Sequence, residues 1–118
     1  METYKRSPWG QIDNQYLIAE GILSVSTPSH GGLKLSADRQ KQMPDFMRSD
    51  DGWYEEDCEW AKVFVVFQAD ILTYGEEYAV KAILSGQHIQ CLKNWYPDAF
   101  EKFYDTVLTP GESYIRSH

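Results

Sequence analysis

Short stretches of apolar and β-branched residues in the first third of the chain predict strands. In 22–27 the apolar side chains of Leu23 and Val25 alternate with serines, so one face of the segment is apolar and the other is polar. Segment 16–19 is similarly apolar, and segment 33–35 alternates again. We therefore predict a small antiparallel sheet built from these three segments.

Two glycine-containing connections separate the predicted strands. Glu20-Gly21 joins the first two strands. The stretch STPSHGG (26–32) joins the second and third strands and is typical of a hairpin connection, in which Gly31 and Gly32 would supply the positive φ angles that tight turns need. Upstream, the stretch SPWG (7–10) predicts a turn that packs an indole on the body of the protein.

Helical signals begin after the third strand. Ser36 is a good N-cap for a helix of about two turns that Pro44 would end, and a polar loop follows over 45–52. We predict the next helix over 54–67, although its VFVVF run also has strand propensity. The acids at 55–57 would lie at the positive end of its dipole. Its apolar residues recur at helical spacing: Trp60, Val63, Phe64 and Phe67.

The C-terminal third predicts two more helices. A broad apolar stripe runs through 76–95, where Gly86 costs about 1 kcal/mol relative to alanine. Pro97 opens a last amphipathic helix over 97–108, and the tail is expected to fray. The predicted fold is α+β: a small N-terminal antiparallel sheet (hairpin around residues 22–35) with three to four helices packed on one face. The expected organisation is a single domain, 1–118, with an N-terminal extension and turn at 1–10 and a frayed tail at 110–118.

Length and composition narrow the class of protein. The chain has 118 residues, which suffices for one domain, and its aromatic share of 14% argues against disorder. No apolar run is long enough to span a bilayer and no secretory signal is visible, so we expect a cytoplasmic protein with no membrane partner. The two cysteines, Cys58 and Cys91, form no disulfide framework and are expected to be reduced.

The negative charge is concentrated in one stretch, which we call the acidic segment (45–59). The formal net charge is −7, and this segment holds seven acids and one base, a balance of −6. Such a field repels nucleic acid and attracts basic surfaces, so we expect no direct nucleic-acid binding and a basic nucleic-acid-binding protein as partner. A solvated face that only keeps the protein soluble is the alternative.

The same segment holds the candidate partner-binding residues. Aromatic rings would supply anchor area, and carboxylates would pair with lysine or arginine across the rim. The alternative is that the rings are buried and only the acids show. Exposed aromatics would also permit a homodimer. The candidates are Asp50, Asp51, Trp53, Tyr54, Glu55, Glu56 and Glu59.

Several residues raise the possibility of catalysis or metal binding. A His30-Gly31-Gly32 turn can form an oxyanion hole, but no GxSxG nucleophile elbow accompanies it. Cys58 with His30 as base is a second option, although flanking acids should raise the pKa of the thiol. A divalent cation held by carboxylates at 55–57 and 59 with His30 or His88 is a third, although only Glu55 and Glu59 share a helical face.

We predict no catalytic residue, no metal and no cofactor. A small hydrolase or metal-dependent enzyme centred on His30 and the acids at 55–59 remains the alternative. A third interpretation is architectural: His30, Gly31, Gly32 and Asp57 would hold the hairpin turn against the start of the 54–67 helix.

Five stretches of this sequence resemble a known family: PWG (8–10), STPSHGG (26–32), LS..R (35–39), GWYEEDCEWA (52–61) and NWYPDAFE (94–101). They resemble a domain-of-unknown-function family, number 7007, whose members are short proteins or modules of proteobacteria, their phages and their plasmids. The resemblance implies a mobile-element accessory protein and brings no activity. Size, charge and setting are similar in style to anti-CRISPR and antirestriction proteins, so the expected function is inhibition of a bacterial defence complex.

Overall fold

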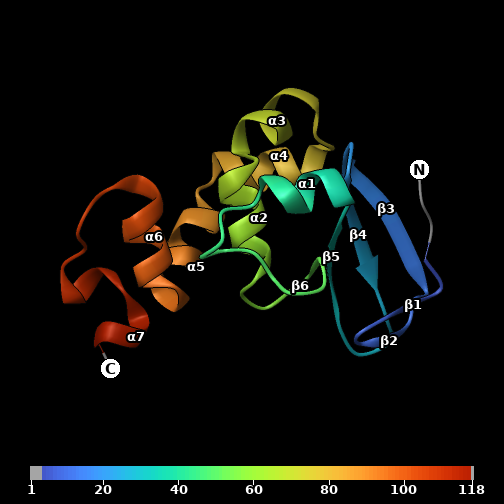
Figure 1. Ribbon diagram of the computed structural model, residues 1–118, viewed down its shortest axis with the longest axis horizontal. Helices are drawn as coiled ribbons and strands as arrows, with labels where there is room; N and C mark the ends of the chain where they lie inside the picture. Colours follow the sequence, from blue (N-terminus) through green and yellow to red (C-terminus); the bar gives the residue numbers. More distant parts are fainter. Residues whose placement is uncertain (1–3, 118) are drawn as a thin grey trace.

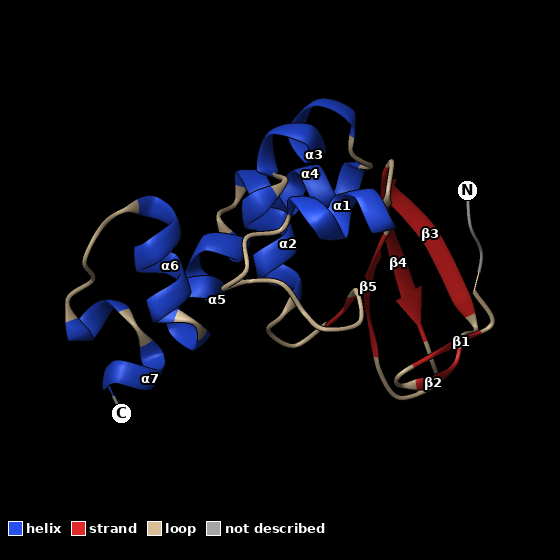
Figure 2. Cartoon of the chain, viewed as in Figure 1, coloured by secondary structure: helices blue, strands red, loops and turns tan. Residues whose placement is uncertain are grey.

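Antiparallel strands occupy the first third of the chain and helices most of the rest (Figures 1 and 2). The computed structural model describes residues 4–117. Its main sheet has the order β3-β4-β5-β6, and every pair is antiparallel. The α+β prediction is confirmed. The strands are β3 (Asn14–Ala19), β4 (Ile22–Ser26), β5 (Gly31–Leu35) and β6 (Trp53–Glu55).

The helices follow one another with short connections. Ser36 caps α1 (Ala37–Gln42) as predicted, accepting a hydrogen bond from the Arg39 N–H at 3.2 Å. The Pro97 prediction is also confirmed, since Pro97 is the first residue of its helix. The remaining elements are α2 (Trp60–Val66), α3 (Gln68–Tyr74), α4 (Glu77–Leu84), α5 (Gln87–Trp95), α6 (Pro97–Tyr104), the 3-10 helix η1 (Pro110–Glu112) and α7 (Tyr114–Ser117).

The two faces of the sheet are covered differently. Alternation along the strands sends one set of side chains into the main core: Ile22, Leu33, Leu35 and Tyr54. Leu23 and Val25, on the opposite face, are buried outside that core. A two-stranded ribbon of β1 (Arg6–Ser7) and β2 (Gly10–Gln11) lies on this outer side, away from the helices (Figure 1).

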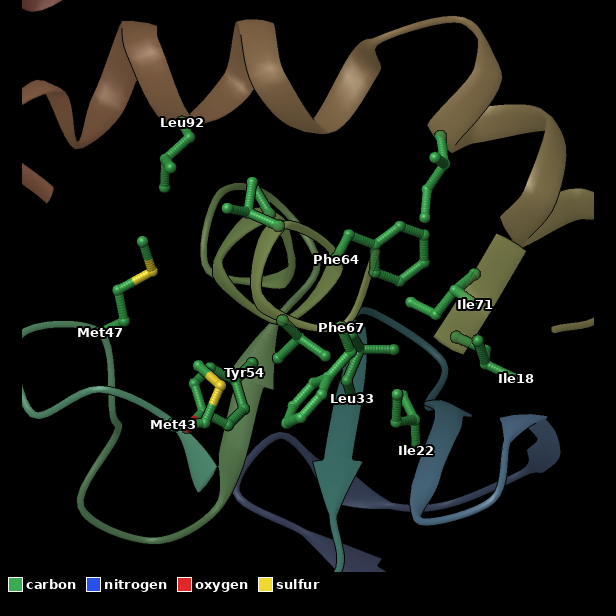
Figure 3. Packing of buried hydrophobic residues seen from close by; sticks show 14 of the residues in the cluster. Ile18, Ile22, Leu33, Met43, Met47, Tyr54, Phe64, Phe67, Ile71 and Leu92 are labelled. Carbon is green, nitrogen blue, oxygen red and sulfur yellow. The ribbon is translucent and has the colours of Figure 1, made fainter. Parts of the chain in front are cut away.

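Helix α2 lies at the centre of the core. Figure 3 shows Phe64 on this helix between the helix that carries Leu92 and the strands that carry Ile22 and Leu33. Except for Lys62, its residues are apolar, which is typical of a helix with neighbours on most sides. This explains why the VFVVF run resembled a strand. The buried residues of α2 are Ala61, Val63, Phe64 and Val65.

The predicted helix over 54–67 is wrong at its start. Residues 53–55 form β6, residues 56–59 form a turn, and α2 begins at Trp60. Tyr54 is fully buried at the edge of the sheet, where its hydroxyl donates to Gln40 Oε1 at 2.6 Å. Burial of this ring and pairing with β5 outweigh the helical spacing that begins six residues later.

The role predicted for the glycines of STPSHGG is also wrong. Neither Gly31 nor Gly32 has a positive φ, and both lie in β5. Their small size is what matters: a Cβ on Gly32 would collide with the Trp9 ring and the Tyr54 carbonyl oxygen. The glycines therefore allow close approach rather than a turn.

The long helix predicted over 76–95 is two helices. Ser85 and Gly86 separate α4 from α5, and Gly86 has a φ of +77°. The helix opened by Pro97 ends at Tyr104 rather than at 108, because Asp105 adopts the left-handed conformation. Helix α3, which the sequence analysis did not predict, occupies 68–74.

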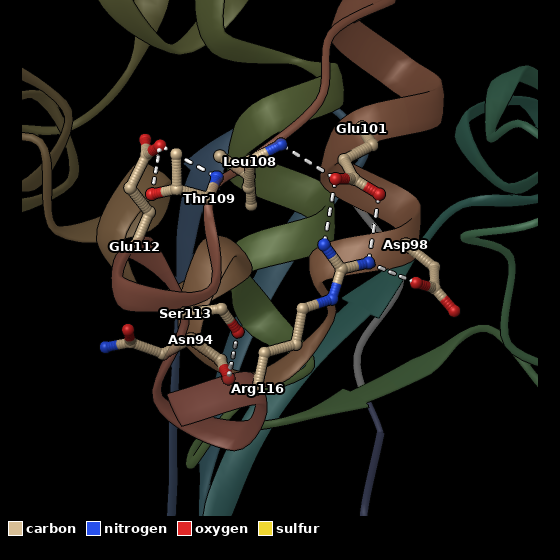
Figure 4. Close-up of polar contacts among 8 residues, drawn as sticks. All are labelled: Asn94, Asp98, Glu101, Leu108, Thr109, Glu112, Ser113 and Arg116. Atoms are coloured by element: carbon tan, nitrogen blue, oxygen red, sulfur yellow. Dashed lines mark hydrogen bonds and ion pairs between the residues drawn. The ribbon is translucent and has the colours of Figure 1, made fainter. Parts of the chain in front are cut away.

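The segment expected to fray contains η1 and α7 (Figure 4). Arg116 donates to Glu101 at 2.8 and 2.9 Å and also pairs with Asp98. The Arg116 guanidinium and the Leu108 N–H lower the pKa of Glu101 to about 2. Ser113 is buried and donates to the Asn94 carbonyl oxygen. These contacts tie the segment to α5 and α6. Among residues 4–117, no helix is long and apolar enough to cross a membrane.

Candidate functional site

The acidic segment forms two turns on either side of β6. The first, over 45–52, is held by Arg48, which donates to Asp45 at 2.8 Å and to the Gln40 carbonyl oxygen at 3.1 Å. Ser49 N–H donates to the buried Tyr54 hydroxyl at 3.1 Å. The path of this loop is therefore fixed by hydrogen bonds to the rest of the fold, and its exposed side chains stand on an ordered backbone.

Some of the carboxylates serve the backbone of these turns. Glu55 accepts from the N–H groups of Asp57, Cys58 and Glu59 at 2.9, 2.7 and 3.2 Å. Asp51 accepts from the Trp53 N–H at 3.0 Å. These two candidate partner-binding residues therefore have a structural role in the turns, which the sequence pattern did not reveal.

Three other carboxylates are exposed and unengaged. Within residues 4–117 the side chains of Asp50, Glu56 and Asp57 make no hydrogen bond or ion pair. Asp45 is also exposed and pairs with Arg48. Asp50, Glu56 and Asp57 are thus the exposed carboxylates of the acidic segment that have no hydrogen bond or ion pair among the described residues, and we call them the acidic surface.

Nearby cations are directed toward other groups. Lys34 donates to the Leu35 carbonyl oxygen and lies 5.7 Å from the Trp53 ring centroid. Lys62 lies 4.0 Å from the Tyr96 ring centroid, and burial lowers its pKa. Neither cation forms an ion pair with Asp50, Glu56 or Asp57, so the three carboxylates are not neutralised by direct pairing.

The predicted aromatic anchors have different environments. Tyr54 is fully buried, so its predicted role as an exposed anchor is wrong. Trp53 is half-buried and meets the Trp9 ring edge-on at a centroid distance of 5.7 Å. Both indoles border a depression of ≈ 390 Å³, whose charged lining residues are Arg48, Asp50, Asp51, Glu59 and Lys62. Trp9 was not among the predicted site residues, although the SPWG turn had marked it as packed on the body.

The His30 side chain forms no hydrogen bond or ion pair with the predicted catalytic partners in residues 4–117. His30 is exposed at the β4–β5 connection, where its N–H donates to Thr27 Oγ1 at 3.1 Å. Within residues 4–117 its imidazole makes no hydrogen bond or ion pair, so the predicted contact with Asp57 is absent. The two motifs meet through backbone instead, since Glu56 N–H donates to the Gly31 carbonyl oxygen at 3.0 Å.

The glycines of the motif do not form an oxyanion hole. Gly31 and Gly32 pair with β4, and Gly32 also pairs with Glu55 of β6. Their backbone groups are therefore part of the ladder, because β5 lies between two hydrogen-bonded neighbours.

The cysteines are not activated for nucleophilic chemistry. Burial raises the pKa of Cys58, and Glu55, Asp57 and Glu59 raise it further, as the sequence analysis predicted for a thiol among acids. Cys91 has a pKa of about 11, because it is buried and lies near Cys58. Its Sγ is 3.8 Å from the Cys58 carbonyl oxygen. Both thiols are protonated at neutral pH.

No metal centre is evident in the described part of the chain, where no group of three or more His, Cys, Asp and Glu side chains has suitable spacing. Glu55 and Glu59 are close, but through the Glu55 N–H, which lies 3.4 Å from Glu59 Oε1. His88 is buried in α5, with Nε2 2.6 Å from Gln68 Oε1. Histidine and carboxylates therefore do not converge on one point.

Comparison with known proteins identifies the family. A family model described as a domain of unknown function (DUF7007) matches residues 2–118. The chain belongs to this family. No curated protein and no solved structure matches it. Family membership confirms the resemblance to this family and assigns no activity.

Proposed function

We propose that the protein is a non-catalytic interaction protein whose acidic surface binds a basic surface of another protein. The observation that carries this proposal is the exposure of Asp50, Glu56 and Asp57 without ion-pair partners on an ordered backbone. Because the backbone of these turns is already ordered, binding would restrict only the side chains, and the field of the carboxylates accelerates encounter with a cationic partner.

The partner that best fits this chemistry is a protein that grips nucleic acid. A groove lined with lysine and arginine is built to neutralise phosphates, and carboxylates can occupy it in their place. The formal charge of −7 disfavours direct binding of nucleic acid by this chain. The depression beside Trp53 would receive a side chain of the partner, with Trp9 and Trp53 as its apolar walls.

We further propose that the partner belongs to a bacterial defence complex, and that the protein is a mobile-element inhibitor of the anti-CRISPR or antirestriction type. The support is the small size, the concentrated negative charge and the mobile-element setting implied by the family resemblance. The enzymatic alternative has no supporting contact in the described residues, since His30 meets neither Cys58 nor a carboxylate.

The test is an affinity pull-down from a bacterial lysate, run with and without nuclease, with tagged wild-type protein and two charge variants. Asp50→Lys/Glu56→Lys reverses the acidic surface while leaving the turn-forming Glu55 and Asp51 intact. The control Asp13→Lys/Glu77→Lys makes the same change in net charge on exposed residues of the β2–β3 connection and of α4. Circular dichroism melting verifies that both variants are folded.

We expect wild type and control to capture a nucleic-acid-binding protein that added duplex DNA displaces. The Asp50→Lys/Glu56→Lys variant should not capture this nucleic-acid-binding protein. Capture that persists in this variant, or that DNA does not displace, would rule out the acidic surface as the binding site. Loss of capture in both variants would point to net charge alone.

A further inference from the structure

One edge of the main sheet has no partner strand. In the order β3-β4-β5-β6, strand β3 pairs only with β4, and nothing in residues 4–117 pairs with its other side. Bonding direction alternates along a strand, so every second residue between Asn14 and Leu17 directs its N–H and C=O away from β4. At the far end, the Ile18 carbonyl oxygen accepts from the Glu76 N–H at 2.8 Å, which leaves 14–17 as the open part.

The open part of β3 lacks the features that protect most edge strands. Its sequence, NQYLIA over 14–19, contains no lysine, no proline and no charged residue. Tyr16 and Leu17 are 46% and 41% exposed, and they lie on opposite faces of the strand. A register shift lies between Leu17 and Ala19, at the end of the strand. The Gln15 side chain exchanges hydrogen bonds with the Tyr4 backbone at 3.3 and 3.4 Å, and these contacts leave the backbone groups of the edge unpaired. An edge of this kind is a template for another extended segment.

A groove lies beside this edge on the outer face of the sheet. It has a volume of ≈ 690 Å³, and the apolar part of its lining on this face comes from Tyr4, Leu17 and Leu23. An added strand would send alternate side chains over these residues, so backbone pairing and apolar contact would act together.

The charged residues that line the groove indicate which kind of partner segment would bind there. Glu20 and Asp38 line it, and both are exposed without a side-chain ion pair in residues 4–117. The nearby cations are engaged: Lys34 donates to the Leu35 carbonyl oxygen, and Arg39 pairs with Asp70. The bond to a carbonyl oxygen does not remove the charge of Lys34, which also lines the groove, so Glu20, Asp38 and Lys34 together give the groove a net charge of −1.

We propose that the β3 edge and this groove form a docking site for an extended segment of a partner protein in which apolar and basic residues alternate. This site is distinct from the acidic surface and does not depend on its proposed function. A second copy of the chain fits less well. Antiparallel pairing of β3 with itself about Tyr16 and Leu17 sets Asp13 opposite Glu20, a like-charge pair at both ends of the ladder.

The test uses the full-length ¹⁵N-labelled protein and a blocked nine-residue peptide that alternates lysine and valine. We expect NMR shift changes and slower hydrogen exchange at the outward-facing amides of 14–17. Replacing lysine by glutamate in the peptide should weaken binding about tenfold or more. Leu17→Lys should do the same, because lysine on an edge strand blocks pairing. The matched control is Leu72→Lys on α3, where the leucine is 39% exposed, and it should leave binding unchanged.

Four results would overturn the proposal. They are the absence of any shift, shifts confined to residues 50–57, slow exchange of the 14–17 amides in the free monomer, and a dimer in sedimentation analysis that Leu17→Lys disperses. The last two would mean that the chain itself, or a second copy, covers the edge. The same lysine–valine peptide is also titrated into the Asp50→Lys/Glu56→Lys variant. Unchanged binding by this variant would show that the β3 site is distinct from the acidic surface.

Discussion

At the scale of single residues, Gly32 allows the Trp9 ring and the neighbouring strand β6 to approach β5 closely. It lies in β5 where the Trp9 ring packs on the outer face and the Tyr54 carbonyl oxygen passes in β6. A side chain at this position would collide with both. The absence of a Cβ therefore fixes where the N-terminal ribbon rests, and through Trp9 it positions the indole of Trp53 beside the acidic surface.

We predict that Gly32→Ala lowers the free energy of unfolding by about 1–3 kcal/mol, the usual cost of overpacking a buried site. The backbone of β6 cannot move away without losing its pairing with β5, so the strain caused by the added Cβ cannot be relieved without cost. Urea unfolding measures the change. Gly111→Ala is the control, because no atom lies within 4 Å of the added Cβ and its φ is not positive. Equal stability of the two variants would contradict the close packing of Trp9 on Gly32.

His88 makes a prediction for pH dependence. It is buried in α5, its Nε2 contacts Gln68, and its Nδ1 has no hydrogen-bond partner in the described residues. Burial lowers its pKa below the ordinary 6.5. As the pH falls through 6.5, His88 becomes protonated in the unfolded chain but stays neutral in the folded chain. The free energy of unfolding therefore decreases toward acid pH, by at most about 1.4 kcal/mol per pH unit.

The measurement is the free energy of unfolding at pH 7.5, 6.5 and 5.5. His88→Gln should flatten the slope over this range, and the exposed His30→Gln should leave it unchanged. A slope that is the same in wild type and His88→Gln would assign the pH dependence to other groups.

At the scale of elements, Gly86 separates two interpretations of the segment 76–95. A continuous helix, as predicted from its apolar stripe, would gain about 1 kcal/mol from Gly86→Ala. In the structure Gly86 has a φ of +77°, and no atom lies within 4 Å of an added Cβ. We therefore predict a loss of about 1 kcal/mol from Gly86→Ala, because alanine disfavours the left-handed region. Thermal or urea unfolding gives the sign directly, and a stabilised variant would favour the continuous helix.

The periodic patterns predicted the elements whose environment is uniform. Strands with one apolar face were found close to their real bounds, as was the helix capped by Ser36. The patterns failed at positions where contacts between distant parts of the chain determine the local structure. Tyr54 is drawn into the sheet by burial, and Gly32 is required by an indole more than twenty positions away in the chain. Neither cause is visible within a local window of sequence.

The candidate site was predictable only in part. Composition located the acidic segment, and the three unengaged carboxylates do lie in it. Sequence did not separate them from Glu55 and Asp51, whose oxygens bind nearby N–H groups. Tyr54 and Trp53 are adjacent, and strand alternation, once β6 is known, puts them on opposite faces. The open edge of β3 follows from strand order, which the sequence does not specify.

At the scale of the whole molecule, one buried cluster connects the sheet to the C-terminal helices. It runs from Ile18 in β3 through α2 to Leu92 in α5 and Phe100 in α6. Helix α2 packs against both the sheet and the C-terminal helices, so a substitution that destabilises one of them should also destabilise the other. The acidic surface, carried by turns that flank β6, depends on this core through the buried Tyr54.

We predict that Leu92→Ala lowers the stability of the sheet and of the C-terminal helices together. Leu92 is fully buried, so its truncation should cost about 2–5 kcal/mol. Native-state hydrogen exchange by NMR, followed at Val25 in β4 and Phe100 in α6, should show equal losses of protection at both amides. Leu84→Ala is the control, since Leu84 is 74% exposed on α4 and should change neither amide. Loss of protection at Phe100 alone would mean that the C-terminal helices open independently of the sheet, and the acidic surface would then survive damage to them.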